Sequence, residues 1–86
     1  MKAYVFISAW VLGGGDDTGD IIELYATKEE AQARLKEDFE SAKSYFEMCD
    51  EDNLDITQSE GEYVVCIKGE YTENHIEGRV LEREIK

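Results

Sequence analysis

One segment, residues 27–49, most constrains how this chain can fold, because its apolar side chains repeat with helical spacing. The apolar positions recur every three or four residues and therefore lie along one stripe of a helix. They are Ala31, Leu35, Phe39, Ala42, Phe46 and Cys49. The opposite side is charged, with Glu29, Lys36, Glu40, Lys43 and Glu47. An apolar stripe must pack on another element, and the other segments have strand or turn patterns, so we predict that this helix covers a sheet.

Both ends of the helix are marked by local signals. Thr27 and Glu30 have the spacing of a capping box, in which the hydroxyl accepts a hydrogen bond from the Glu30 amide and the carboxylate reaches back. At the other end, carboxylates at residues 50–52 oppose the negative end of the helix dipole, so the helix should end there. We expect Asn53 to adopt the left-handed conformation that terminates many helices.

The first predicted strand, residues 3–12, is apolar at both phases of the two-residue repeat. This pattern is typical of a central strand that is covered on both faces. The helix can cover only one face, so the other is left for a second copy, a flap of the same chain or a ligand. A glycine-rich loop, Gly13–Asp20, then leads to a second strand over residues 21–26, which should pair antiparallel with the first.

Three more strands are predicted after the helix, over residues 54–58, 62–68 and 76–85. The apolar phase changes within the last of them, which fits a bulge near residues 78–80 or a partly exposed edge of the sheet. The resulting order is strand-strand-helix-strand-strand-strand. We therefore expect a single α+β domain over residues 1–86, with one amphipathic helix on a mainly antiparallel sheet of four to five strands.

Charge restricts the classes of partner. The chain has 21 Asp and Glu residues against nine Lys and Arg, for a net charge of −12. Phosphate backbones and anionic lipids repel such a surface, so nucleic-acid and membrane binding are disfavoured. A basic protein or a cation is the partner that electrostatics favours.

Cysteine use and the N-terminal segment bear on the compartment. Cys49 and Cys66 fit no metal motif and lie among apolar residues, so we expect buried free thiols in a reducing environment. The apolar N-terminal segment lacks a signal-peptidase site and is too short to span a bilayer. A cytoplasmic location is expected.

The Gly13–Asp20 loop is a candidate cation site, because Asp16, Asp17 and Asp20 offer the hard oxygen ligands that Ca²⁺ or Mg²⁺ prefer. Their spacing fits no EF-hand, and a solvated hairpin loop is the alternative interpretation. Phosphate binding is disfavoured, because the loop leads into a strand rather than a helix and carries no lysine.

Enzymatic chemistry has weak support in the sequence. His75 is the only histidine and lies between Glu73 and Glu77, which would suit a proton carrier, a single metal ligand or a surface side chain. There is no nucleophile motif, and three Cys and His residues in all are too few and too dispersed for a zinc site. We expect neither an enzyme nor a bound cofactor.

Several stretches together resemble a known group of proteins: YVFISAW, the GGGDDTGD loop, IELYATKEEAQ at the start of the helix, and GEYTENHI. The chain is similar to short acidic proteins of gut-type bacteria and their phages or mobile elements, a group with no assigned function. The resemblance covers most of the chain and supplies no catalytic residues. It implies an accessory protein that acts as a regulator or inhibitor through protein contacts.

The function predicted from these observations is a small acidic cytoplasmic interaction module that acts through protein–protein contacts as a homodimer. A divalent-cation-binding domain using the Gly13–Asp20 loop is one alternative. Another is a nucleic-acid mimic, in which the acidic run at residues 50–55 occupies the Lys and Arg residues of a basic protein. Lys36 and Lys43 on the helix make its outer face mixed in sign, which weakens such mimicry.

Overall fold

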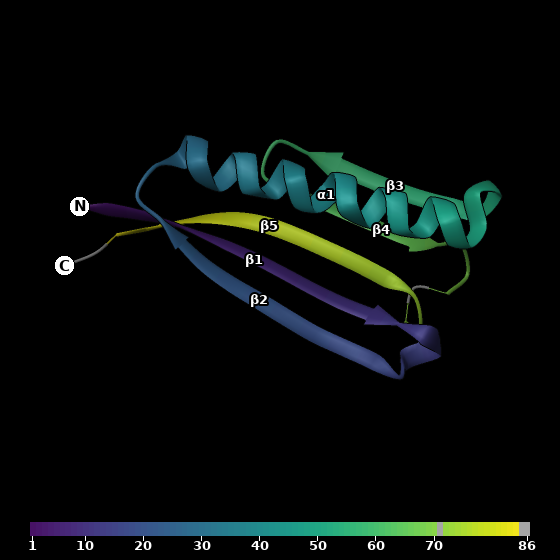
Figure 1. The fold of residues 1–86 in the computed structure, drawn as a ribbon. Coiled ribbons are helices and arrows are strands. Elements are labelled where there is room, and N and C mark those ends of the chain that lie inside the picture. The colour runs from purple at the N-terminus through teal and green to yellow at the C-terminus, as the bar shows by residue number, and fades with distance from the viewer. Residues whose placement is uncertain (71, 85–86) are drawn as a thin grey trace.

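The computed structural model describes the backbone of residues 1–70 and 72–84, and their side chains except at positions 50 and 51 (Figure 1). It contains one helix, α1 (Lys28–Asp50), and five strands: β1 (Lys2–Leu12), β2 (Asp17–Tyr25), β3 (Leu54–Ser59), β4 (Glu62–Ile67) and β5 (His75–Glu84). Short 3-10 turns span Gly13–Gly15 and Glu51–Asn53. The predicted α+β class and element order are confirmed.

The strands form a single sheet in the order β2-β1-β5-β4-β3, antiparallel at every pairing. β1 lies between β2 and β5, so the strand that is apolar at both phases has a neighbour on each side. α1 crosses one face of this sheet (Figure 1). The shortest dimension of the molecule, 16 Å, accommodates one sheet layer and one helix layer. No described element covers the opposite face of the sheet, and we call it the open face.

The core lies between α1 and the middle strands. Phe6, Phe46, Tyr63 and Val65 are at most 2% exposed and form its centre. Leu35, Ala42 and Ile67 complete the buried cluster. Fully burying an apolar side chain of this size contributes about 1.5–3 kcal/mol, so these few residues supply much of the stability of a small domain.

The N-terminus of α1 forms close to the predicted boundary. The Thr27 Oγ1 accepts a hydrogen bond from the Glu30 amide at 3.2 Å, as a capping residue should. The hydroxyl in turn donates to Glu30 Oε1 at 2.9 Å. The carboxylate therefore binds the capping hydroxyl itself, where the sequence predicted that it would reach back to the backbone.

The C-terminal end of the helix differs from the prediction in two ways. Asn53 is not left-handed, since no described residue other than glycine has a positive φ. The helix instead tightens into a 3-10 turn, and the carbonyl of Asn53 accepts a hydrogen bond from the Lys68 amide at 2.8 Å. Cys49 was expected to be buried and is exposed, because the buried stripe ends at Phe46, before the last turn of the helix.

The β1–β2 connection is much shorter than the predicted Gly13–Asp20 loop. β2 begins at Asp17, and the chain reverses direction within residues 13–16. Gly13, Gly14 and Gly15 all have positive φ, which permits this tight reversal. Gly19 is a strand residue covered by the indole of Trp10, where an added Cβ would lie 2.4 Å from Cζ2.

β5 pairs with β1 without the predicted bulge. The register is continuous from Lys2 opposite Glu84 to Val11 opposite His75. The change in apolar phase arises because Val80 faces the helix while Leu81 lies on the open face. Ile85, the last apolar residue of the predicted strand, lies outside the described residues.

Candidate interaction surfaces

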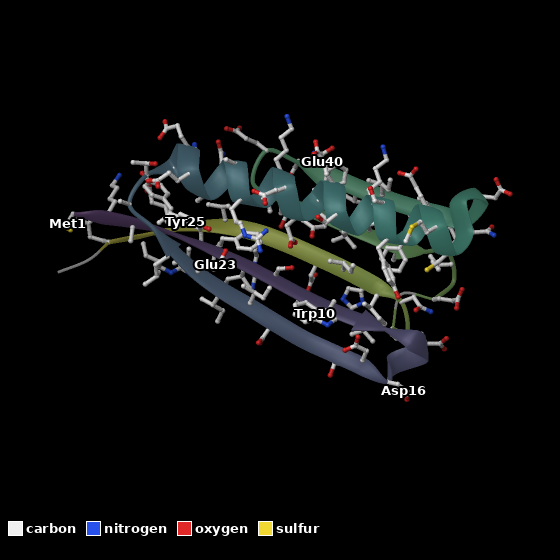
Figure 2. The ribbon with its side chains drawn as sticks, in the orientation of Figure 1. Met1, Trp10, Asp16, Glu23, Tyr25 and Glu40 are labelled. Atoms are coloured by element: carbon white, nitrogen blue, oxygen red, sulfur yellow. The ribbon has the colours of Figure 1, made fainter. Side chains whose placement is uncertain are left out.

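A polar network joins α1 to the sheet at the centre of the molecule. The hydroxyl of Ser8, which is 1% exposed, donates to Asp38 Oδ2 at 2.8 Å, and the Tyr63 hydroxyl donates to the same oxygen. The Arg34 Nη1 lies 3.6 Å from Asp38 Oδ1, and Arg34 Nε donates to Glu23 Oε1 at 2.8 Å. Figure 2 shows Glu23 on β2, from which it reaches the helix.

This network is structural in character. In the described part of the chain, no buried side-chain nitrogen or oxygen lacks a hydrogen-bond partner. Burial and the hydrogen bond to Asp38 raise the pKa of Tyr63 well above that of an ordinary tyrosine. A serine beside a carboxylate could suggest a nucleophile, but the Ser8 hydroxyl is only 1% exposed and donates its hydrogen to Asp38. The network orients α1 on the sheet.

The predicted cation ligands are not brought together. Asp16 lies at the tip of the β1–β2 hairpin (Figure 2), while Asp17 and Asp20 are on β2 itself. Asp17 pairs with Leu12 and Asp20 with Ala9, so the alternation of a strand sends their side chains to opposite faces of the sheet. Among the described residues, no group of three or more His, Cys, Asp or Glu side chains is arranged to hold a metal ion. The geometry gives the cation-site hypothesis no support.

His75 begins β5, where it pairs with Val11 of β1 and Cys66 of β4. Cys66 is 7% exposed, and burial raises the pKa of its thiol, which makes it a weak nucleophile. We interpret His75 and Cys66 as sheet residues rather than as a reactive pair.

The open face carries an apolar patch formed by Val5, Ile7, Ile22, Leu24 and Leu81. Val5 is opposite both Leu24 and Leu81, and Ile7 is opposite Ile22. The two β2 side chains at its edge are strongly exposed, Ile22 at 65% and Leu24 at 72%. Large apolar side chains on neighbouring strands merge into a continuous surface, which is typical of an interaction site.

Charged side chains border this open-face patch. Arg79 is opposite Ile7 and Arg83 is opposite Ala3, so two of the three arginines of the chain lie on the open face. Glu62 pairs with Arg79 from β4, and Glu77 follows along β5. Arginine is enriched in protein interfaces, and here it adjoins carboxylates within one surface. The patch therefore combines an apolar centre with charges of both signs at its border.

A second apolar surface lies on the helix side of the sheet, between α1 and the β1–β2 hairpin. We call it the α1–β1 groove. Its volume is about 190 Å³. The floor consists of Trp10, Leu12 and Ile76, and the helix wall consists of Ser41, Ala42 and Tyr45. The carboxylate of Asp38 closes one end.

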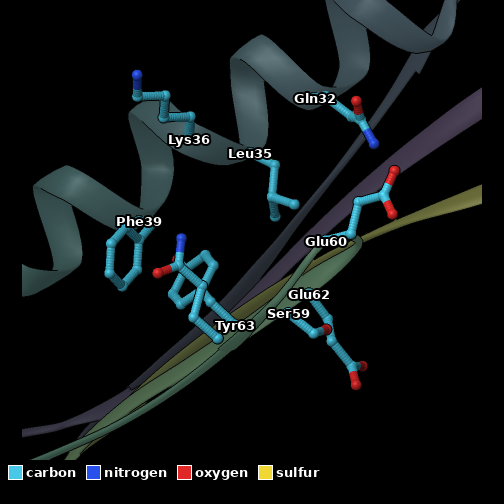
Figure 3. A pocket seen from close by; sticks show the side chains of 9 residues that line it. Gln32, Leu35, Lys36, Phe39, Ser59, Glu60, Glu62 and Tyr63 are labelled. Carbon is cyan, nitrogen blue, oxygen red and sulfur yellow. The ribbon is translucent and has the colours of Figure 1, made fainter.

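A third hollow, shown in Figure 3, lies between α1 and the β3–β4 turn and has a volume of about 220 Å³. Phe39 and Tyr63 meet edge to face at its base with 5.3 Å between ring centroids. Gln32 and Glu60 extend toward one another across its opening (Figure 3). Sites for small organic ligands are usually larger, about 300–1,000 Å³, and have more convergent polar groups. This hollow is a packing feature of the turn.

Only part of these surfaces was foreseen from the sequence. The open face follows from the two apolar phases of residues 3–12. The Ser8–Asp38–Tyr63 network was not predicted. A signal for it was present, because Ser8 is the one polar residue in the run AYVFISAWVL and a buried hydroxyl requires a partner. The α1–β1 groove has no local signal, because its lining comes from three elements.

Comparison with known proteins identifies no relative, so the function must be inferred from the surfaces of the molecule. No family model, no curated protein and no solved structure matches this chain. Among the described residues, no helix is both long enough and apolar enough to cross a membrane.

Proposed function

We propose that this protein is a small acidic interaction module that acts through protein–protein contacts and associates with a second copy through the open face. The observation that carries the proposal is the continuous apolar patch, in which Ile22 and Leu24 are 65% and 72% exposed. A soluble monomer gains nothing from such a patch on an uncovered sheet, whereas burying it releases ordered water.

The size of the open face suits a dimer. Five strands spaced by about 4.8 Å, paired over roughly 25 Å, present about 600 Å² of surface on each copy. Stable protein interfaces bury about 600–1,000 Å² on each partner. Two such faces can pack as in a β-sandwich, where sheets lie about 10 Å apart.

The charges at the border of the patch favour a symmetric pairing. A two-fold axis brings the same surface of both copies together, so an arginine of one copy can meet a carboxylate of the other. Arg79 and Arg83 would supply the positive groups, with Glu62 and Glu77 the negative ones. The net charge of −12 on each copy opposes association, so the dimer should strengthen as added salt screens the repulsion.

The cellular setting is also part of the proposal. The thiols of Cys49 and Cys66 are free, which is consistent with the reducing cytoplasm. The resemblance to short acidic proteins of phages and mobile elements suggests the role of a regulator or inhibitor. The outer face of α1 favours the mimic alternative less, because Lys43 lies 4.0 Å from Glu47 and interrupts the negative surface.

The test is sedimentation equilibrium of the wild-type protein, of the Ile22→Thr/Leu24→Thr variant and of Ile56→Thr. Threonine keeps the β-propensity of each position while removing most of its apolar surface. Ile56 is the matched control, because it is a 39% exposed isoleucine on the other edge strand. We expect the wild-type protein and Ile56→Thr to form dimers of similar affinity. The dimer dissociation constant of the double variant should be at least about tenfold higher, which corresponds to about 1.4 kcal/mol. A wild-type protein that stays monomeric up to millimolar concentration would refute the proposal, as would equal effects of both sets of substitutions.

A further inference from the structure

The α1–β1 groove is on the opposite side of the sheet from the open face, so it stays accessible when the open face is covered. Its floor is apolar, with Trp10, Leu12 and Ile76 side by side. Tyr45 forms the outer wall and is 39% exposed. These side chains are held by the fold but are not sealed from solvent, which distinguishes the groove from the core.

The groove exists because small residues line the contact between the helix and β1. Ser41 and Ala42 on α1, and Ser8 on β1, occupy positions where a larger side chain would fill the space. Figure 1 shows the β1–β2 hairpin diverging from α1 toward the Gly13–Gly15 turn. The floor on this part of the hairpin is therefore left without a covering helix.

The size of the groove limits what can enter it. A volume of about 190 Å³ is below the range of about 300–1,000 Å³ that is usual for small-molecule sites. It matches one large apolar side chain, such as leucine, methionine or phenylalanine. An adjoining hollow, lined by Glu37, Glu40, Ser44 and Met48, shares Ser41 and Tyr45 with the groove. An occupant of the groove would therefore pass directly over this second surface.

The rim of the combined surface is negative. Glu37 and Glu40 line the adjoining hollow, and Asp38 closes the groove. On the hairpin side, Asp17 is close enough to contribute to the raised pKa of Tyr45, although burial and Cys49 have larger effects. The one cation of this flank of the helix, Arg34, is already paired with Glu23 and Asp38. Lys36 lies in the hollow on the other flank, beside the β3–β4 turn.

We infer that the α1–β1 groove is the docking site for a basic amphipathic helix of another protein. One apolar side chain of that helix would enter the groove above Trp10. Lysine or arginine residues three or four positions away lie on the same side of a helix and would reach Glu37 and Glu40. Charge complementarity selects such an occupant over a second copy of this acidic chain, which would bring like charges together. The inference goes beyond self-association, because it assigns a separate surface to a different partner.

Fluorescence of Trp10 provides the assay, since it is the only tryptophan of the chain and forms the floor of the groove. The probe is a synthetic amphipathic peptide of about 14 residues, long enough to form a helix on binding, composed of leucine and lysine. The same peptide with glutamate in place of lysine is the control probe. We expect the Leu/Lys peptide to shift the Trp10 emission with saturable binding that weakens at high salt, and the Leu/Glu peptide to have no effect.

Two matched pairs of variants separate docking in the groove from general attraction to an acidic protein. Ser41→Phe fills the groove, whereas Ala33→Phe adds the same side chain at another exposed helix position. Glu37→Gln/Glu40→Gln removes two charges from the rim, whereas Glu29→Gln/Glu47→Gln removes two charges elsewhere on α1. All these positions are exposed, so the fold should be kept, and far-ultraviolet circular dichroism verifies this.

We expect Ser41→Phe to weaken binding of the Leu/Lys peptide at least tenfold and Ala33→Phe to change it less than twofold. Glu37→Gln/Glu40→Gln should weaken binding several-fold more than Glu29→Gln/Glu47→Gln does. Equal losses in the two double variants, together with an unchanged affinity in Ser41→Phe, would show non-specific attraction and overturn the inference. Binding without a change in Trp10 emission would also overturn it.

Discussion

Gly78 is the position at which a single added methyl group should do the most damage. It lies on β5 opposite Tyr63 of β4 and Ser8 of β1. A Cβ at this site would lie 2.5 Å from Tyr63 Cε1 and 3.2 Å from Leu35 Cδ1. Tyr63 is 2% exposed and is held by its hydrogen bond to Asp38, so its ring cannot move aside without breaking that bond. We therefore predict that Gly78→Ala disrupts both the core and the polar network.

The cost has two parts. Forcing an extra methyl group into a packed core costs about 1–3 kcal/mol. Displacing Tyr63 leaves a buried polar group without its partner, which costs about 1–3 kcal/mol more. A chain of 86 residues has a total stability of roughly 4–13 kcal/mol, so an expected loss of about 2–6 kcal/mol is a large fraction of it.

Urea denaturation followed by circular dichroism and by Trp10 fluorescence measures this loss. We expect the midpoint of Gly78→Ala to fall by at least about 1 M. Gly61→Ala is the matched control, because the nearest atom to its added Cβ is the Val80 carbonyl oxygen at 4.0 Å. This variant should keep or slightly raise the midpoint, since alanine restricts the unfolded chain. If the two variants differ by less than about 0.5 kcal/mol, the packing of Tyr63 over Gly78 is not what the structure indicates.

Two further predictions concern ionisation and thiol reactivity. Burial and Asp38 raise the pKa of Tyr63 in the folded protein above the ordinary value of 10.0, so its contribution to stability is present below about pH 10 and is lost as pH rises beyond it. Tyr63→Phe should lower stability at neutral pH, and the stability of this variant should decline less steeply than that of the wild-type protein above about pH 10. Urea midpoints at neutral and alkaline pH test this. Parallel declines in both proteins would contradict it. Cys49 is exposed, whereas Cys66 is buried and its thiol has a raised pKa. A thiol reagent such as dithionitrobenzoate should therefore label Cys49 quickly and Cys66 only on unfolding. Cys49→Ser should abolish the fast phase, and a fast phase that survives this substitution would contradict the assignment.

The elements with local signals were the predictable part of this fold. α1 begins directly after Thr27, because the capping hydroxyl and the apolar stripe both act over a few residues. The two apolar phases of β1 correctly indicated a central strand with one face left uncovered by the helix. These features depend on neighbouring residues, so the sequence expresses them directly.

The strand order and the second groove could not be predicted in the same way. The pairing of β1 with β5 joins segments distant in the chain, and the apolar patterns fit several other orders equally well. The predicted bulge in β5 was wrong, because Leu81 changes phase by facing the open side of the sheet. Its place there follows from the pairing of Val5 with Leu24 and Leu81, which the sequence alone does not indicate. The predicted long loop was wrong because Trp10 can cover Gly19 only after the hairpin has paired.

The pairing of β1 with β5 also has a consequence for how the chain folds. β1, β2 and α1 are consecutive and can form early, whereas the second neighbour of β1 is the last of the five strands to be synthesised. Contacts between such distant segments slow folding, because a long loop must close before they contribute stability. Until β5 arrives, β1 presents an unpaired apolar edge that can pair with another chain. The rate at which β5 inserts between β1 and β4 therefore governs the competition between folding and aggregation.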